Sequence, residues 1–170
     1  MSTYLETASM AACTFSDGNL KRSGSISTEN ELSLQGPLEV AGSVNSGRSI
    51  NFDGDFSVAG SIDAYGKITT RGNMRCDGQI KAYGNILMNG SMVSSDKIIG
   101  YGKLRVDGTL QGNHLEIWGN LVVIGYLRCR SLVVYGSLTL IGSGSTYMVE
   151  ESEEIAGVKL MRDQEADWDW

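Results

Sequence analysis

The chain has 170 residues, of which 41% are hydrophobic and 20% are charged, and its formal net charge is −6. This length fits a single domain, and the acidic balance argues against a nucleic-acid partner, which would require a basic face. No stretch reaches the roughly 18 apolar residues of a membrane span, so we expect no transmembrane segment.

Residues 1–17 contain neither a basic stretch nor a long apolar stretch, so we expect an N-terminal flank or cap and no secretory signal. The three cysteines, Cys13, Cys76 and Cys129, lack the CxxC spacing of zinc sites and do not form a disulfide framework. We therefore expect no metal and a cytoplasmic location. Cys76 and Cys129 are interpreted as small core residues, and Cys13 as the reachable thiol.

Glycine recurs with a period of six residues and predicts a hexapeptide solenoid over residues 18–142. The periodic glycines are Gly18, Gly24, Gly36, Gly42, Gly54, Gly60, Gly66, Gly72, Gly78, Gly84, Gly90, Gly102 and Gly108, then Gly119, Gly125, Gly136 and Gly142 after two one-residue slips. The second residue after each corner is apolar, and between residues 51 and 113 almost all charges fall on odd positions. This alternation predicts short strands with one buried face.

Five aromatic residues set a longer period. Tyr65, Tyr83, Tyr101, Trp118 and Tyr135 each precede a corner glycine, at spacings of 18, 18, 17 and 17 residues. Three hexads per turn follow, with about seven turns spaced by roughly 4.8 Å, and the aromatic side chains are expected to stack as an outward column on one edge. Hairpins are excluded because they need longer strands and two-residue turns.

The G-x-[ILVM]-x-[small/apolar]-x hexad over about residues 36–142 resembles the bactofilins, a family of polymer-forming bacterial cytoskeletal proteins. The resemblance implies an all-β, single-domain, right-handed parallel β-helix of triangular section. It also implies that the chain polymerises end to end without nucleotide or another cofactor, into non-polar filaments that are often recruited to a membrane. The Pro-rich tails of the family and a membrane-targeting motif are missing here, which leaves membrane association open.

Two other functions remain as alternatives. Left-handed hexapeptide acyltransferases place an aliphatic residue before each glycine, whereas this chain has residues such as Gln35, Asp53 and Asp77 there. His114, the one histidine, is expected to replace a corner glycine, and we expect no catalytic residues because a general base needs partners within reach. The second alternative is a binding module that uses the aromatic column, with a polysaccharide as the candidate ligand.

The predicted function is therefore that of a self-assembling scaffold whose main partner is itself. The end-to-end contact is assigned to Leu20, Ile26 and Leu32 at one end and to Leu138, Leu140 and Ile141 at the other. A lateral or tail-docking surface is assigned to Ile99, Tyr101, Trp118, Val122, Ile124, Val133 and Tyr135, because an outward apolar strip needs a cover. That cover is either a neighbouring rod or the acidic C-terminal tail, residues 143–170, which is also a possible contact for a protein partner.

Overall fold

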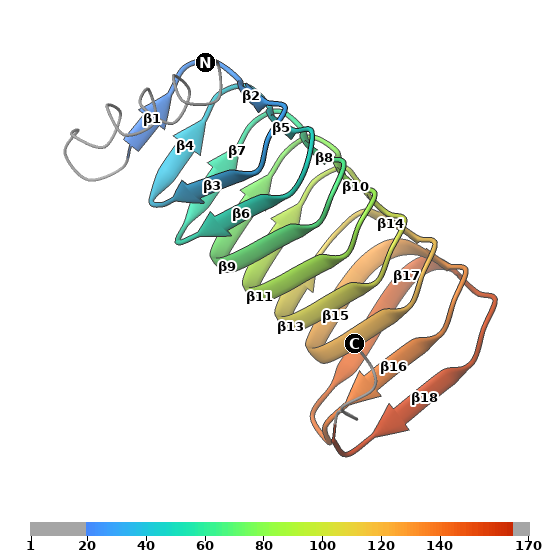
Figure 1. Cartoon of the computed structure of the whole chain (residues 1–170). Coiled ribbons are helices and arrows are strands. Elements are labelled where there is room, and N and C mark those ends of the chain that lie inside the picture. The colour runs from blue at the N-terminus through green and yellow to red at the C-terminus, as the bar shows by residue number, and fades with distance from the viewer. Residues whose placement is uncertain (1–19, 165–170) are drawn as a thin grey trace.

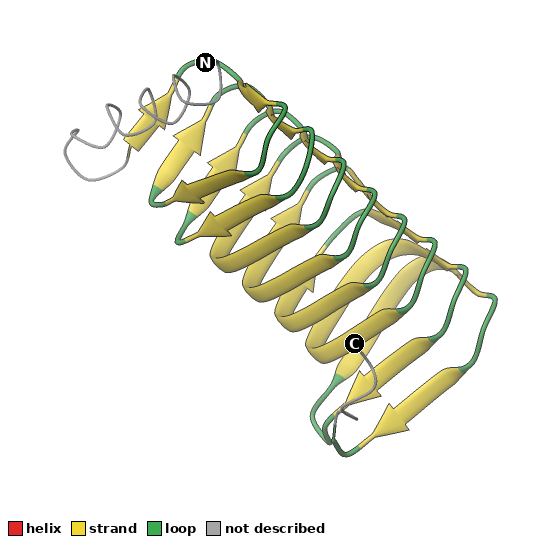
Figure 2. Cartoon of the chain, in the orientation of Figure 1, coloured by secondary structure: helices red, strands yellow, loops and turns green. Residues whose placement is uncertain are grey.

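The computed structural model describes residues 20–164, and all of their regular secondary structure is β-strand (Figure 2). The strands stack in parallel as a solenoid of about 8 turns, which confirms the single-domain parallel β-helix (Figure 1). Within these residues no helix has the length and apolar character that crossing a membrane requires.

The strands form three faces, here called A, B and C. Face A contains β1 (Leu20–Arg22), β4 (Leu38–Val40) and β7 (Phe56–Val58). Face B contains β2 (Ile26–Thr28), β5 (Val44–Ser46), β8 (Ile62–Ala64), β10 (Ile80–Ala82), β12 (Lys97–Gly100) and β14 (His114–Ile117). Face C contains β3 (Leu32–Gln35), β6 (Ile50–Asp53), β16 (Leu138–Ile141) and β18 (Lys159–Arg162).

The remaining strands run around a corner from one face to the next. β9 (Ile68–Cys76), β11 (Ile86–Ser94) and β13 (Leu104–Gln111) begin on face C and end on face A. β15 (Leu121–Val134) continues over all three faces, and β17 (Thr146–Ile155) covers faces A and B. These long strands tie successive faces together through continuous backbone pairing.

The pairing register follows the aromatic period. Ile62 is aligned with Ile80 and Ile80 with Ile98, in steps of 18 residues. The next steps, from Ile98 to Leu115 and from there to Leu132, are of 17 residues. At both predicted slips the turn is one residue shorter, yet the apolar residues of successive turns stay aligned and their side chains still point into the core.

Alternate side chains fill a continuous core, as the period-two pattern predicts. One inward column runs through Ile68, Ile86, Leu104, Leu121 and Leu138, none of which is more than 2% exposed. Because the inward side chains of each inner turn are covered by equivalent residues of the turns on either side, the core needs no separate layer along the length of the rod.

The glycines answer two different requirements. Gly72 has a φ of +108°, and a Cβ added there would lie 2.5 Å from the carbonyl oxygen of Gly54 in the preceding turn. At another corner, a Cβ on Gly84 would lie 2.8 Å from the carbonyl carbon of Gly66, with no unusual φ recorded. Position 72 thus needs glycine because of its positive φ and because the backbone of the preceding turn is too close for a Cβ. Position 84 needs glycine for the second reason alone.

The solenoid does not end at residue 142, where the sequence pattern placed its boundary. β17 and β18 pair in parallel with β15 and β16, so the stretch interpreted as an acidic tail supplies another turn. The hexad pattern misses this turn because its register steps lengthen to 20 and then 21 residues, with a bulge opposite Cys129 and Ser131. The buried Ser145 accepts a hydrogen bond from the N–H of Gly125, 3.0 Å away, and anchors the longer corner.

Candidate assembly surfaces

Each end of the rod presents strands that are paired on one side only within the described residues. At the N-terminal end these strands are β1, β2 and β3, and at the C-terminal end β17 and β18 (Figure 1). Two backbone hydrogen bonds show which groups of β2 face the next turn. Ile26 N–H donates to Ser43 O at 2.8 Å, and Thr28 O accepts from Gly47 N–H at 2.9 Å. Because peptide groups alternate along a strand, the N–H and C=O of Ser27 point out of the N-terminal end.

The N-terminal residues predicted to make the end contact face the interior. Ile26 and Leu32 are 1% and 6% exposed, respectively. Leu20 begins β1 and is aligned with Leu38, but its side chain lies outside the described part. An end contact here would therefore use the strand edge rather than these side chains, and their interface role stays a prediction.

The C-terminal residues predicted for the same role do not lie at the end. Leu138 is 1% exposed and Ile141 is 5% exposed. Both are aligned with residues of β18, as is the half-buried Leu140, so a further strand covers all three. The prediction was wrong because it stopped the solenoid one turn too early.

The last described turn of the rod carries charged groups at inward positions. Tyr147, Glu153 and Lys159 are aligned with the inward core residues Leu127, Leu132 and Leu138, one on each face. We call these three residues the terminal lid. Lys159 Nζ lies 2.5 Å from Glu153 Oε2 and 5.7 Å from the centre of the Tyr147 ring. Inward-pointing charge at an open sheet edge is a known way of opposing strand addition.

Glu153 and Lys159 of the lid stabilise each other's charged forms. Partial burial opposes ionisation of Glu153, but hydrogen bonds with Lys159 and Tyr147 outweigh it and lower the pKa of the carboxyl below its ordinary value. Hydrogen bonds of Lys159 with Glu153, the larger cause, and with Tyr147 raise the pKa of its ammonium group. Burial is the first cause that raises the pKa of the Tyr147 hydroxyl.

The aromatic column lies on the edge between faces B and C, as expected. Tyr65, Tyr83, Tyr101, Trp118 and Tyr135 stack with successive ring centroids 5.2, 5.0, 6.0 and 4.2 Å apart. Each ring is between 41% and 67% exposed. Because the rings stack on one another, most of the column presents ring edges to solvent, which leaves few open faces on which a sugar could stack.

The residues predicted to form one lateral surface are divided between two faces. Ile99 and Val133 lie on face B and are separated by Glu116, which pairs with Lys97 at 2.7 Å. Trp118 Nε1 donates a 2.9 Å hydrogen bond to that same carboxylate. Val122 and Ile124 lie on face C, and Val122, predicted to be outward and exposed, is only 5% exposed. No continuous strip therefore joins all the predicted residues.

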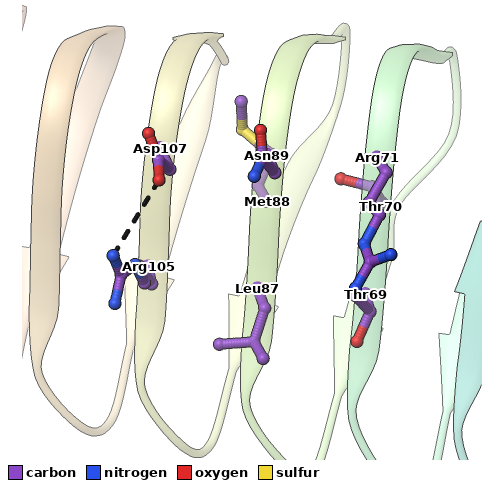
Figure 3. Close-up of a pocket in the computed structure, with 8 residues that line it drawn as sticks. All are labelled: Thr69, Thr70, Arg71, Leu87, Met88, Asn89, Arg105 and Asp107. Carbon is purple, nitrogen blue, oxygen red and sulfur yellow. Dashed lines mark ion pairs between the residues drawn. The ribbon is translucent and has the colours of Figure 1, made fainter.

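Face C also has a shallow hollow across β9, β11 and β13 (Figure 3). Its polar side chains include Arg71 and the pair Arg105–Asp107, whose charged atoms are 3.9 Å apart. The residues form rows along the rod, with Leu87 between Thr69 and Arg105 (Figure 3). Across residues 20–164, no three His, Cys, Asp or Glu side chains are grouped so that they could hold a metal ion.

Two remaining sequence interpretations are resolved by the register. His114 is not a corner residue: it begins β14, is aligned with Lys97 and Ser131, and makes a short hydrogen bond to the Ser131 hydroxyl through Nδ1. Cys76 and Cys129 are buried free thiols, and burial is the first cause that raises the pKa of each to about 11. Cys13 lies outside the described residues.

Comparison with protein families, with curated proteins and with solved structures finds no match for this chain.

Proposed function

We propose that this protein is a self-assembling scaffold whose rigid β-helix associates end to end with further copies and needs no nucleotide. The observation that carries the proposal is the in-register set of strands at the N-terminal end, one on each of the three faces, that are paired on one side only among residues 20–164. Unpaired strand edges are templates for pairing with another chain. A filament role of the kind that bactofilins have is part of the same proposal.

The two ends are expected to differ in strength. Behind the N-terminal edge lies an apolar layer that includes Ile26 and Leu32. The C-terminal edge carries the Glu153–Lys159 pair of the terminal lid, and a contact there would have to desolvate both charges. The N-terminal end therefore supports the firmer contact, and copies that meet through the same end would be related by a two-fold axis.

The test is to block one end at a time. Ser27→Pro removes an N–H that points out of the N-terminal end and leaves the bonds to the next turn in place, whereas Ser27→Thr keeps that N–H and is the matched control. Met161→Pro removes an N–H that points out of the C-terminal end. The Arg162 carbonyl oxygen accepts a hydrogen bond from Gly142 N–H at 2.8 Å, so Arg162 faces the preceding turn and the N–H of the neighbouring Met161 faces the opposite way. Negative-stain microscopy and sedimentation velocity report rod length and mass.

Wild type and Ser27→Thr are expected to form particles longer than one rod, which measures about 38 Å for about eight turns at ~4.8 Å each. Ser27→Pro is expected to shorten them more than Met161→Pro does. A wild-type protein that stays monomeric at high concentration, across salt and pH, would refute the proposal. Equal lengths in all four proteins would refute assembly through strand edges.

A further inference from the structure

The shallow hollow on face C is part of a longer trough. A second hollow, of about 270 Å³, lies across β3, β6 and β9, and it shares Thr69 and Arg71 with the first, which has about 310 Å³. Together the two hollows run from β3 to β13, four steps between turns, or about 19 Å along the rod. We call this feature the face-C trough.

Two rows of outward side chains border the trough and run parallel to the rod axis (Figure 3). One row is Ser33, Asn51, Thr69, Leu87 and Arg105, and the other is Gln35, Asp53, Arg71, Asn89 and Asp107. Inward residues of the same strands, such as Phe52 and Met88, line the floor between the rows. A linear polymer that lies along the rod would therefore meet side chains of both rows at every turn.

Cations outnumber carboxylates along the trough, although the whole chain carries a net charge of −6. The outward positions of face C from β6 to β13, with the residue that precedes each strand, hold four cations and two carboxylates: Lys67, Arg71, Lys103, Arg105, Asp53 and Asp107. Arg71 is exposed and has no ion pair within residues 20–164. In Figure 3 its side chain extends toward Thr69, so the guanidinium group lies between the two rows. A guanidinium in this position can bind a carboxylate through two parallel hydrogen bonds.

Neutral polar groups beside Arg71 can bind hydroxyl groups. Asn51 and Asn89 are exposed on opposite rows, and neither side chain is hydrogen-bonded within the described part of the chain. A side-chain amide both donates and accepts hydrogen bonds, as does the hydroxyl of Thr69. The hydroxyl groups of a sugar also do both, so they can pair with these side chains.

Two other kinds of linear polymer fit the trough less well. Nucleic acids are bound by many cations and by aromatic rings that stack on bases, whereas the trough contains Asp53 and Asp107 and has no exposed aromatic side chain in its lining. An extended peptide binds by adding to an open strand edge, but β6, β9, β11 and β13 are each paired on both sides.

We propose that the face-C trough binds a linear polysaccharide that carries carboxylate groups and lies parallel to the rod axis. Arg71 binds one carboxylate. Asn51, Thr69 and Asn89 bind neighbouring hydroxyl groups. Binding by a single rod does not depend on the assembly proposed above, but rods that assemble would hold one such polymer at several troughs and so more tightly.

The test is isothermal titration calorimetry of the full chain with an oligogalacturonate long enough to span the trough. Its methyl ester, which lacks the charges, and a single-stranded oligonucleotide of similar length are titrated alongside. Arg71→Gln removes the guanidinium from the trough. Arg75→Gln is the matched control, because Arg75 is an exposed, outward arginine on face A and its loss changes the net charge equally. Circular dichroism verifies the fold, and Asn89→Ala replaces Arg71→Gln if that variant unfolds.

The oligogalacturonate is expected to bind wild type and Arg75→Gln equally well and Arg71→Gln roughly tenfold more weakly, the loss of one hydrogen bond to a charged group. Absence of binding to wild type, or equal weakening in both arginine variants, would overturn the proposal. So would a methyl ester that binds as tightly as the acid, or an oligonucleotide that binds more tightly. If the acid does not bind and the mass from sedimentation velocity falls in Arg71→Gln alone, the trough is a contact with a second copy of the chain and the proposal is wrong.

Discussion

The corner glycine Gly72 offers the sharpest test of the fold. Gly72→Ala places a Cβ 2.5 Å from the Gly54 carbonyl oxygen at a residue whose φ is +108°. Carbon and oxygen atoms that contact one another without a covalent bond normally stay at least about 3.3 Å apart. One of the two turns must therefore move by roughly 0.8 Å at this corner, the difference between those two distances.

The expected cost has two parts. An alanine at a φ of this kind is strained by about 1–3 kcal/mol. The displacement also stretches the 2.8 Å hydrogen bond from Gly54 N–H to Arg71 O at the same corner, and a backbone hydrogen bond at a partly exposed site contributes about 0.5–1.5 kcal/mol net. Their sum, ~1.5–4.5 kcal/mol, is a large share of the ~5–15 kcal/mol by which proteins are usually stable.

A second glycine in the middle of the rod provides the matched control. Gly100 occupies an inward position aligned with Ala82, and a Cβ there would make ordinary 3.4 Å contacts with Ile86 and Ile117. Gly100→Ala is expected to stabilise the protein by about 0.4–1 kcal/mol, because it restricts the unfolded chain without straining the folded one.

Urea denaturation followed by circular dichroism gives the free energy of unfolding for both variants. A value for Gly72→Ala within ~0.5 kcal/mol of wild type, the range of neutral surface changes, would show that the corner is not as close as described. An equal loss in Gly100→Ala would show that the two glycines do not differ in the way argued here.

Three further predictions concern side chains. Cys76 and Cys129, with pKa values raised to about 11, should resist iodoacetamide at neutral pH until the chain unfolds, as mass spectrometry of labelled peptides would show; rapid labelling would contradict their burial. Because the pKa of Glu153 is lowered on folding, its pairing with Lys159 stabilises the last turn above the ordinary value of 4.5 and loses that effect as pH falls through the folded pKa; the protection of β17 amides against hydrogen exchange, taken relative to the intrinsic exchange rate at each pH, should fall at low pH in wild type, and a Glu153→Gln variant with the same pH profile would argue against the lid. Tyr101→Ala removes two ring stacks and should cost about 1–3 kcal/mol at ~0.5–1.5 kcal/mol each, whereas Tyr101→Phe should be nearly neutral in the same denaturation assay.

Much of the fold could be predicted because its signals are local. A strand exposes alternate side chains whatever it pairs with, so the inward columns through Ile68 and Leu104 were readable from the sequence. The aromatic spacing fixed three strands per turn, since residues that precede equivalent corners must stack when turns are in register. Both expectations are confirmed by the pairing of β9 with β11 and of β11 with β13.

The candidate surfaces were less predictable, because they depend on which residues lie side by side in space. An apolar outward residue looks the same in the sequence whether it lies on face B or on face C, so Ile99 and Val122 were assigned to one surface. Only the register shows Glu116 interrupting the face-B residues. The end of the rod was misplaced for a related reason: Leu138 and Ile141 resemble a last turn because the turn above them is not apolar.

What the sequence by itself determined is therefore the repeating unit: strand, corner glycine, inward apolar residue and the number of strands per turn. What the tertiary structure decided is how the last described turn, β17 and β18, pairs with the turn before it. This turn departs from the hexad pattern. Its inward positions hold Tyr147, Glu153 and Lys159 instead of aliphatic residues, and polar side chains are tolerated there because they are in reach of water. Its alignment is set by the turn beneath it, through bonds such as Gly157 N–H to Gly136 O at 2.9 Å, and no local pattern encodes that pairing.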